Sequence, residues 1–229
     1  MPRYKLQYAK EGPSRFISHL DLLRTIERAA RRAGLPLVFS QGFNPHPKIT
    51  FAAPLGVGVA GEAEWGEIEL LGDIPEEEVT AAMSGVLPEG LRVNAVVRVP
   101  EEAPSLMSRV ERGAYRCEAD LAGPPSPGEL EQAVQAFLDR GEIAVRRKTK
   151  AGVEKKVDIR PGILAMSVRA DDDIIRVEME LKTGSSGNVR VEEALGALLD
   201  ALALPLKTGD FSLFRTGIYA GSGERREDL

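Results

Sequence analysis

The sequence predicts an α+β fold made of two tandem ferredoxin-like units with antiparallel sheets, each in the order βαββαβ. Three observations support it: short alternating segments are interleaved with amphipathic ones, their order occurs twice, and an acidic, Pro-containing stretch separates the two repeats. We expect an N-terminal unit at residues 1–100, a linker at 101–113, a C-terminal unit at 114–220 and a disordered tail at 221–229. A single larger α+β sheet is the competing architecture.

The first unit starts with the alternating segment RYKLQYAKE, typical of a strand, and continues with a helix over HLDLLRTIERAARRA. Ser18 is the expected N-cap, because Asp21 follows three residues later as in a capping box. Gly34 and Pro36 end the helix. We expect one apolar stripe to pack on the sheet, formed by Leu20, Leu23, Ile26, Ala30 and Ala33.

The remainder of the first unit completes the strand and helix order. Its expected elements are strand segments at 35–40 and 47–55 on either side of a loop, an alternating strand at 64–72, a helix at 75–87 and a strand at 91–99. The Gly-rich segment LGVGVAGE fits a flexible connection, since it lacks the spacing of either nucleotide-binding glycine motif.

The second unit repeats this order with one addition. Its expected elements are a strand at 114–121, a helix beginning at Ser126 or Pro127, a strand at 174–182, a helix at 189–202 and a last strand at 211–220. Between them, residues 143–150 and 155–160 are basic strands that flank a turn at Ala151 and Gly152. Residues 161–173 add an extra strand or loop.

Composition excludes several classes of protein. With one cysteine among 229 residues, Cys117, no internal disulfide forms, and we expect a reducing cytoplasm and a buried structural thiol. One Cys and two His do not suffice for a Cys-rich metal centre, so we expect no cofactor. No run approaches the ~18 to 20 apolar residues that cross a bilayer, and the polar start differs from a secretory signal.

The net charge of −5 hides two basic segments on an acidic chain. Residues 1–52 carry a net charge of +6 and residues 145–160 a net charge of +5, whereas residues 53–100 carry −7. Local potential decides where an anion binds, so the two basic segments favour a specific polyanionic partner.

The helix carries the first group of candidate residues. Arg24, Arg28 and Arg31 share one face at spacing i, i+4, i+7, and arginine matches phosphate oxygens in pairs. Glu27 can neutralise part of this face through Arg31 at i+4. The alternative is an ordinary solvated helix face. Arg15 before the helix and Lys48 after it favour phosphate binding.

The start of the helix and the loop SQGFNPHPK carry the second group. Ser18 and His19 lie at the positive end of the helix, where an anion is favoured; alternatively, Ser18 only caps and His19 only covers the first turn. In the loop, Gln41, Asn44 and His46 are suited to contact a base or sugar. Phe43 either stacks on a base or fills the core below its loop.

Acidic residues form a third candidate surface. Glu62, Glu64, Glu67 and Glu69 mark an exposed strand face or a surface for a basic partner. The run Glu76–Glu78 is expected at a helix N-terminus, where it stabilises the helix dipole.

The segment SHLDLLRTIERAARRAGLPLVFSQGFNPHPKITFAAPLGVG, with its SHLDLLR and GFNPHPK signatures, resembles the radical-SAM-linked protein family. That family is a domain of unknown biochemical role encoded beside, or fused to, a radical S-adenosylmethionine enzyme. The similarity covers residues 1–70 and continues more loosely through KTKAGVEKKVDIRPGI. It implies partnership with a radical SAM enzyme, for which this chain supplies recognition. The chain lacks the three-cysteine cluster motif, so the resemblance does not assign radical chemistry to it.

We therefore expect a non-catalytic RNA-binding accessory protein that presents a structured RNA, tRNA or rRNA, to a partner radical SAM modifying enzyme. The candidate nucleic-acid-binding residues are Arg15, Ser18, His19, Arg24, Arg28, Arg31, Gln41, Asn44, His46, Lys48, Arg146, Arg147, Lys148, Lys150, Lys155 and Lys156. Two alternatives stay open. One is a metal-independent RNA endonuclease that uses His19 and His46, and the other is a protein adaptor whose acidic surface at 62–78 binds the radical enzyme.

Overall fold

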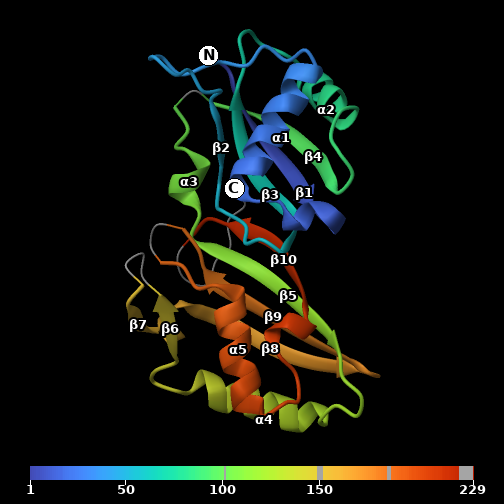
Figure 1. Cartoon of the computed structure of the whole chain (residues 1–229), viewed down its shortest axis with the longest axis vertical. Helices are drawn as coiled ribbons and strands as arrows, with labels where there is room; N and C mark the ends of the chain where they lie inside the picture. The colour runs from blue at the N-terminus through green and yellow to red at the C-terminus, as the bar shows by residue number, and fades with distance from the viewer. Residues whose placement is uncertain (101, 149–151, 185–186, 222–228) are drawn as a thin grey trace. The chain divides into compact units, whose positions relative to one another are not determined.

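The computed structural model describes residues 1–100, 102–148, 152–184, 187–221 and 229. Within them the chain is a mixed α+β structure with five α-helices and strands that pair antiparallel, which confirms the predicted class (Figure 1). The chain divides into two compact units. Unit 1 comprises Met1–Val110 and Arg215–Leu229, and unit 2 comprises Glu111–Phe214.

Unit 1 contains most of the strongest sequence signals. Its elements are β1 (Arg3–Lys10), a 3-10 turn (Gly12–Phe16), α1 (His19–Arg32), β2 (Ile49–Phe51), β3 (Ala60–Glu69), α2 (Glu76–Ser84), β4 (Leu91–Val99) and the short α3 (Leu106–Arg109). In the sheet, β1 lies between β3 and β4, and β2 pairs with the C-terminal end of β3. The last strand, β10 (Ser212–Tyr219), is the other neighbour of β3.

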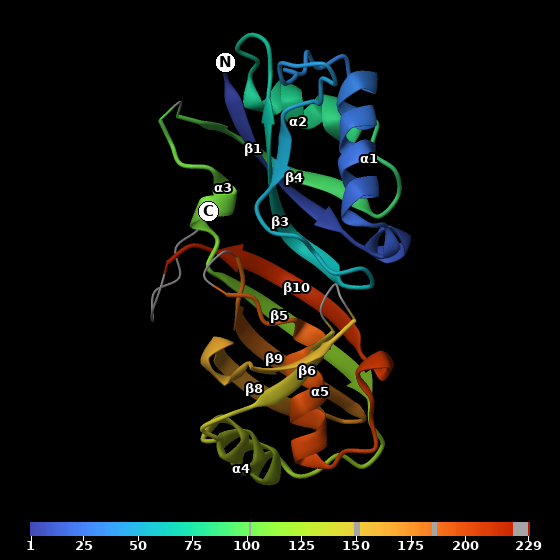
Figure 2. The same cartoon turned by 60° about the vertical axis from the view of Figure 1, so that its left-hand side comes forward.

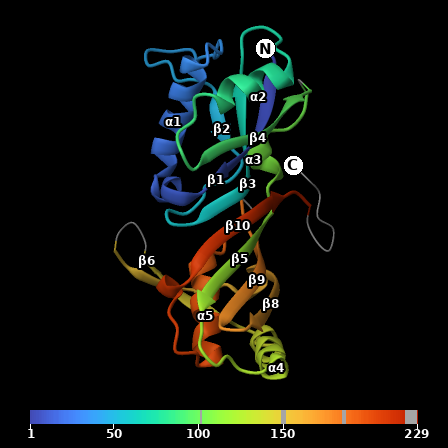
Figure 3. The ribbon, with the colours of Figure 1, turned by 90° about the vertical axis from the view of Figure 1, so that its right-hand side faces the viewer.

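The core of unit 1 follows from alternation along β1. Tyr4, Leu6 and Tyr8 are buried, whereas the residues between them are partly exposed. These side chains join the buried residues of α1 and α2 in one apolar cluster, so both helices cover the same face of the sheet (Figure 3).

The predicted start of α1 is confirmed, but its predicted apolar stripe is partly wrong. The Ser18 hydroxyl accepts a hydrogen bond from the Asp21 N–H, as expected of an N-cap. The buried positions are Leu22, Ile26, Ala29 and Ala30. Leu20 is exposed, because it lies about 200° around the helix from Leu22.

The strand predicted at 35–40 is not formed. Leu37 and Phe39 make only isolated bridges, to Leu70 and Pro47, and the strand predicted at 47–55 is reduced to the three residues of β2. Proline provides the physical reason, because it has no N–H for a ladder and restricts the residue before it.

Unit 2 contains β5 (Arg112–Asp120), α4 (Pro127–Leu138), β6 (Ala144–Lys148), β7 (Glu154–Asp158), β8 (Ile163–Asp171), β9 (Ile174–Lys182) and α5 (Val191–Leu202). β9 lies between β5 and β8 (Figure 2), and β6 and β7 form a separate two-stranded sheet (Figure 1). The ambiguous segment 161–173 is therefore mainly strand β8. Of the expected tail at 221–229, residues 222–228 lie outside the described residues.

Candidate nucleic-acid interface

Arg24, Arg28 and Arg31 are exposed on α1, but two of them are already in ion pairs. Arg24 lies 3.4 Å from Asp21, and Arg31 lies 2.8 Å from Glu27, which confirms the expected i, i+4 pair. In the part of the chain that the structure describes, the Arg28 guanidinium has no acidic partner. Exposed pairs of this kind are weak, so all three arginines keep donors for a phosphate.

The loop at 40–48 is held closed at its base. The Ser40 N–H donates to the His46 carbonyl at 2.8 Å, and the His46 N–H donates to the Ser40 hydroxyl oxygen at 3.0 Å. Gly42 has a φ of 130°, in a region that disfavours other residues. The two hydrogen bonds between Ser40 and His46 close the base of the loop. The tip between them has no backbone pairing to a β-strand of the described chain.

The tip of this loop presents an aromatic ring to solvent. Phe43 has a relative exposure of 111%, so it does not fill the core below its loop. Gln41, Asn44 and His46 are exposed on the same loop. The structure thus removes the core-filling role that was one of the two expected of Phe43.

The last turn of α1 lies against the base of the loop. The Arg31 guanidinium carbon is 5.4 Å from the centre of the Phe39 ring, which directly precedes the loop. Figure 3 shows the chain that contains this loop continuing from the C-terminal end of α1. Arg31 therefore contacts the residue from which the loop that carries Phe43 begins.

Lys48 is less available than its exposure indicates. Its ammonium group is 2.7 Å from the Glu69 carboxylate at the end of β3. An RNA phosphate at Lys48 must compete with this carboxylate.

The N-terminal end of α1 is already occupied by an acid. The Ser18 hydroxyl donates to Asp21 Oδ2 at 2.7 Å while accepting from its N–H. This hydrogen bond, followed by the charge of Arg24, lowers the pKa of Asp21, so the carboxylate persists at the positive helix end. A second anion there meets like charge, which leaves Ser18 with its capping role.

Arg15 and His19 lie at this same end of α1. The Arg15 guanidinium stacks over Phe16 at 4.8 Å, and the His19 and Phe51 rings pack in a T-shaped arrangement with their centres 5.2 Å apart. α1 has 14 residues and is therefore ~21 Å long, so these groups lie about that far from the loop at its other end.

The two histidines are not brought together. His19 contacts Phe51 at the end of β2, whereas His46 lies in the loop that precedes β2. Phe51 follows His46 by five positions of mostly extended chain, which corresponds to ~16 Å. This arrangement does not support an endonuclease site in which both imidazoles act on one scissile bond.

The acidic face predicted on β3 is largely buried. Arg215 Nε donates to Glu64 Oε1 at 2.7 Å, a second bond joins Arg215 Nη2 to Glu64 Oε2, and both side chains are almost fully buried. Arg215 also donates to the carbonyls of Ala53 and Pro54 at 3.1 Å. Glu67 is 5% exposed. Two of the four acids predicted on this strand face, Glu64 and Glu67, thus serve the interior of unit 1.

Lys10 is a second buried charge near this pair. Its ammonium group donates to the carbonyls of Arg15 and Ile17 at 3.2 and 3.0 Å. Burial lowers the pKa of Lys10, and the nearby Glu64 carboxylate opposes that shift. The buried charges hold the turn before α1 in place and do not form an exposed surface.

The basic hairpin of unit 2 is partly neutralised. Arg147 bonds both carboxylate oxygens of Glu193, at 2.8 and 2.6 Å. Arg146 lies 3.6 Å from Glu154, and Lys156 lies 2.9 Å from Glu142. Lys148 and Lys155 are exposed, and the structure gives them no acidic partner among the described residues. Lys150 lies outside those residues.

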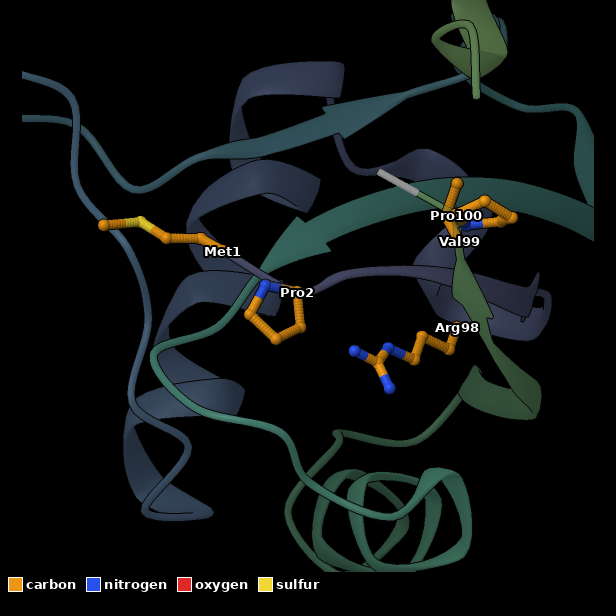
Figure 4. Close-up of a pocket in the computed structure, with 5 residues that line it drawn as sticks. All are labelled: Met1, Pro2, Arg98, Val99 and Pro100. Carbon is orange, nitrogen blue, oxygen red and sulfur yellow. The ribbon is translucent and has the colours of Figure 1, made fainter. Parts of the chain in front are cut away.

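None of the candidate residues lines the pocket shown in Figure 4. This pocket of ≈ 380 Å³ is formed by Met1, Pro2, Arg98, Val99 and Pro100. The Arg98 guanidinium forms an ion pair with the Asp73 carboxylate, with Nη1 and Oδ2 2.7 Å apart.

Among the described residues, no three His, Cys, Asp or Glu side chains gather as they would around a metal ion. No helix in the same residues has the length and apolar character required to span a bilayer.

The chain belongs to a family described as "Uncharacterized protein conserved in bacteria (DUF2344)", whose profile matches residues 3–191. This membership corrects the resemblance to the radical-SAM-linked family, because the matched family shows no link to radical SAM enzymes. No curated protein sequence matches the chain.

Three solved structures align with this chain at low identity, and the first of them shows the fold alone. A chain from "Crystal Structure of a Cbf5-Nop10-Gar1 Complex" aligns with a TM-score of 0.50 and 12% identity. The alignment covers 94% of this chain, which spans about half (48%) of that one. An unknown protein from Galdieria sulphuraria aligns at a TM-score of 0.27, with 11% identity over 88% of this chain and 89% of the other. A putative glycine cleavage system transcriptional repressor aligns at 0.24, with 11% identity over 96% and 98%.

Proposed function

We propose that this member of an uncharacterized bacterial family binds RNA through unit 1. The binding surface, which we name the α1–loop face, consists of Arg28 and Arg31 on α1 together with the exposed loop residues Gln41, Phe43, Asn44 and His46. The proposal includes no radical SAM enzyme.

The exposed ring of Phe43 carries the proposal. Burying a phenylalanine side chain is worth ~1.5–3 kcal/mol, and the folded chain forgoes this at a ring that is 111% exposed. An unpaired base can cover such a ring by stacking, which contributes ~1–3 kcal/mol per base. The closed base of the loop reduces the entropy lost when the ring is ordered by a ligand.

The groups around Phe43 supply the remaining chemistry of RNA recognition. Arg28 and Arg31 present flat guanidinium donors that match phosphate oxygens. Gln41 and Asn44 each offer a donor and an acceptor to a base edge. Basic groups that hold the backbone beside an aromatic ring that stacks a base are typical of proteins that bind single-stranded regions.

The RNA that fits is a structured one with an unpaired loop, such as a tRNA or rRNA. In a duplex the bases are stacked on one another, and the ring of Phe43 has no free base face to cover. We therefore expect the loop of a hairpin to bind, and its stem to bind only through phosphates.

We also propose that both units have the tandem ferredoxin-like arrangement predicted from the sequence. In unit 1 the order β4-β1-β3, with β2 paired to β3, supports it. In unit 2 the order β5-β9-β8 supports it, with β6 and β7 as an inserted hairpin.

The test compares two exposed phenylalanines in fluorescence anisotropy titrations with a labelled RNA hairpin. Phe43→Ala should weaken binding about tenfold or more, because one stacked base is lost. Phe16→Ala is the matched control, since Phe16 is 59% exposed at the other end of α1 and should leave affinity unchanged. Equal affinities for wild type and Phe43→Ala would reject the proposal, provided both variants melt at the wild-type temperature.

A salt titration tests the phosphate contacts separately. The logarithm of the affinity should fall with the logarithm of salt concentration, and Arg28→Ala should reduce that slope by about 0.7 for one lost contact to a single strand. In unit 2, Lys155→Ala tests the hairpin in the same way. An unchanged slope for Arg28→Ala would remove it from the α1–loop face.

A further inference from the structure

The outer edge of unit 2 has unpaired backbone groups beside a groove. β8 is the last strand in the order β5-β9-β8, and it pairs with β9 from Ile163 to Asp171. Within the described residues, the backbone of 164–171 makes no hydrogen bonds other than those to β9. Alternate N–H and C=O groups of β8 therefore point outward without a protein partner.

A groove of ≈ 550 Å³ runs between this edge and α4. α4 and β8 lie side by side in all three views of the fold, most openly in Figure 2. One face of the helix, at the spacing expected of a single stripe, contributes Pro127, Glu131, Val134, Gln135 and Leu138. From β8 the groove is lined by residues 166–171.

The apolar lining of the groove comes from both β8 and α4. Met166, Val168 and Ala170 alternate with exposed residues on β8, so they face the α4 side together with Val134 and Leu138. Met166 and Val134 are buried, whereas Val168, Ala170 and Leu138 are partly exposed and suit side chains at every second position of an added strand.

The wall formed by α4 carries one acidic side chain, Glu131. The helix segment PGELEQAVQAFL contains two acids and no Lys or Arg. Glu129 is used by the capping box with Ser126, whereas Glu131 lines the groove and has no basic partner in the described part of the chain. Arg169 is the one basic residue among those that line the groove, and it lies on the β8 face opposite the apolar side chains.

We propose that this groove binds an extended segment of a partner protein, which adds to β8 as a further strand. The segment carries apolar side chains at alternate positions toward Val168 and Leu138, and a Lys or Arg that reaches Glu131. Backbone hydrogen bonds to β8 supply affinity, and the alternate side chains supply specificity. A partner segment of about six extended residues is ~20 Å long and covers part of the nine-residue edge of β8.

Synthetic peptides provide the probe. Ac-TVTVTKT-amide and its reversed form Ac-TKTVTVT-amide place Val, Val and Lys on one face of an extended chain in either direction. At a free concentration about ten times its Kd, the better peptide should slow hydrogen exchange in residues 163–171 about tenfold. Residues 112–120 of β5 should not change.

Two comparisons make the test specific. Glu131→Lys changes an exposed residue, so the fold is retained; it should weaken the Lys peptide about fivefold and favour the peptide with Glu in place of Lys. A peptide methylated at the backbone nitrogens of the edge that faces β8 should lose binding, because those nitrogens no longer donate hydrogen bonds to β8.

Three results would overturn the proposal: no slowing in residues 163–171 with either peptide at millimolar concentration, equal binding of the methylated peptide, or no response to Glu131→Lys. Sedimentation distinguishes a different occupant. If the wild-type chain is a dimer whose β8 amides are already protected without peptide, a second copy covers this edge and the proposed partner is wrong.

Discussion

Two regions of unit 1 contain the same pair of groups, an arginine and a glutamate, in opposite surroundings. Arg31 and Glu27 lie on the outer face of α1, one turn apart and in contact with water. Arg215 and Glu64 are 2% and 1% exposed and are joined by two hydrogen bonds. In the first region the charges remain available to a ligand, whereas in the second they fix β10 and the chain at Ala53 and Pro54 against β3.

The difference shows that burial, rather than residue type, decides which charges serve binding. An exposed pair is screened and contributes little, so a phosphate can replace its carboxylate at low cost. A buried pair has no solvent to replace a lost partner, so breaking it is expensive.

The largest expected effect is on the buried pair. Arg215→Ala should lower the free energy of unfolding by about 3–5 kcal/mol, because it leaves the Glu64 carboxylate buried without its partner. Urea denaturation at pH 7 measures this loss. The double variant Glu64→Leu/Arg215→Met should recover much of it, and a single variant as stable as wild type would show that this pair is not buried in solution.

Cys117 extends the comparison to a buried neutral group in unit 2. Burial raises the pKa of its thiol to about 12, above the ordinary value of 9.0. Between these values the unfolded chain loses the proton and the folded chain keeps it, so stability falls as pH rises above 9, by up to about 1.4 kcal/mol per pH unit. Denaturation from pH 8 to 10.5 should show a steeper fall for wild type than for Cys117→Ala; parallel curves would contradict the assignment.

The exposed pairs should give the smallest effects on stability. Arg31→Ala should change the free energy of unfolding by less than about 1 kcal/mol, and Lys48→Ala should do the same through its pair with Glu69. Thermal melts in low and high salt check this, since the small difference should shrink as salt screens the pairs. A loss as large as that of Arg215→Ala would mean that the α1 charges are structural.

Local signals predicted the bounds and the cap of α1 well. The helix expected from residue 19 to 33 is observed at His19–Arg32, with Ser18 as its cap, because capping and helical periodicity depend on neighbours in the sequence. The pair between Glu27 and Arg31 was predictable from its spacing for the same reason.

Contacts between distant segments could not be predicted in this way. Glu64 and Arg215 are 151 residues apart, and an alternating acidic strand has the same pattern whether its acids face water or a buried arginine. The pair of Lys48 with Glu69 likewise depends on the pairing of β2 with β3. The exposure of Phe43 depends on how its loop closes. Composition alone did not decide whether the ring fills the core or faces a ligand.

The most direct test of the central claim is ultraviolet crosslinking of the wild-type chain to an RNA hairpin, followed by mass spectrometry of the crosslinked peptides. The α1–loop face predicts that nucleotides from the unpaired loop attach within residues 40–48, at Phe43 or its neighbours. Crosslinks confined to other parts of the chain, with residues 40–48 unmodified, would contradict it.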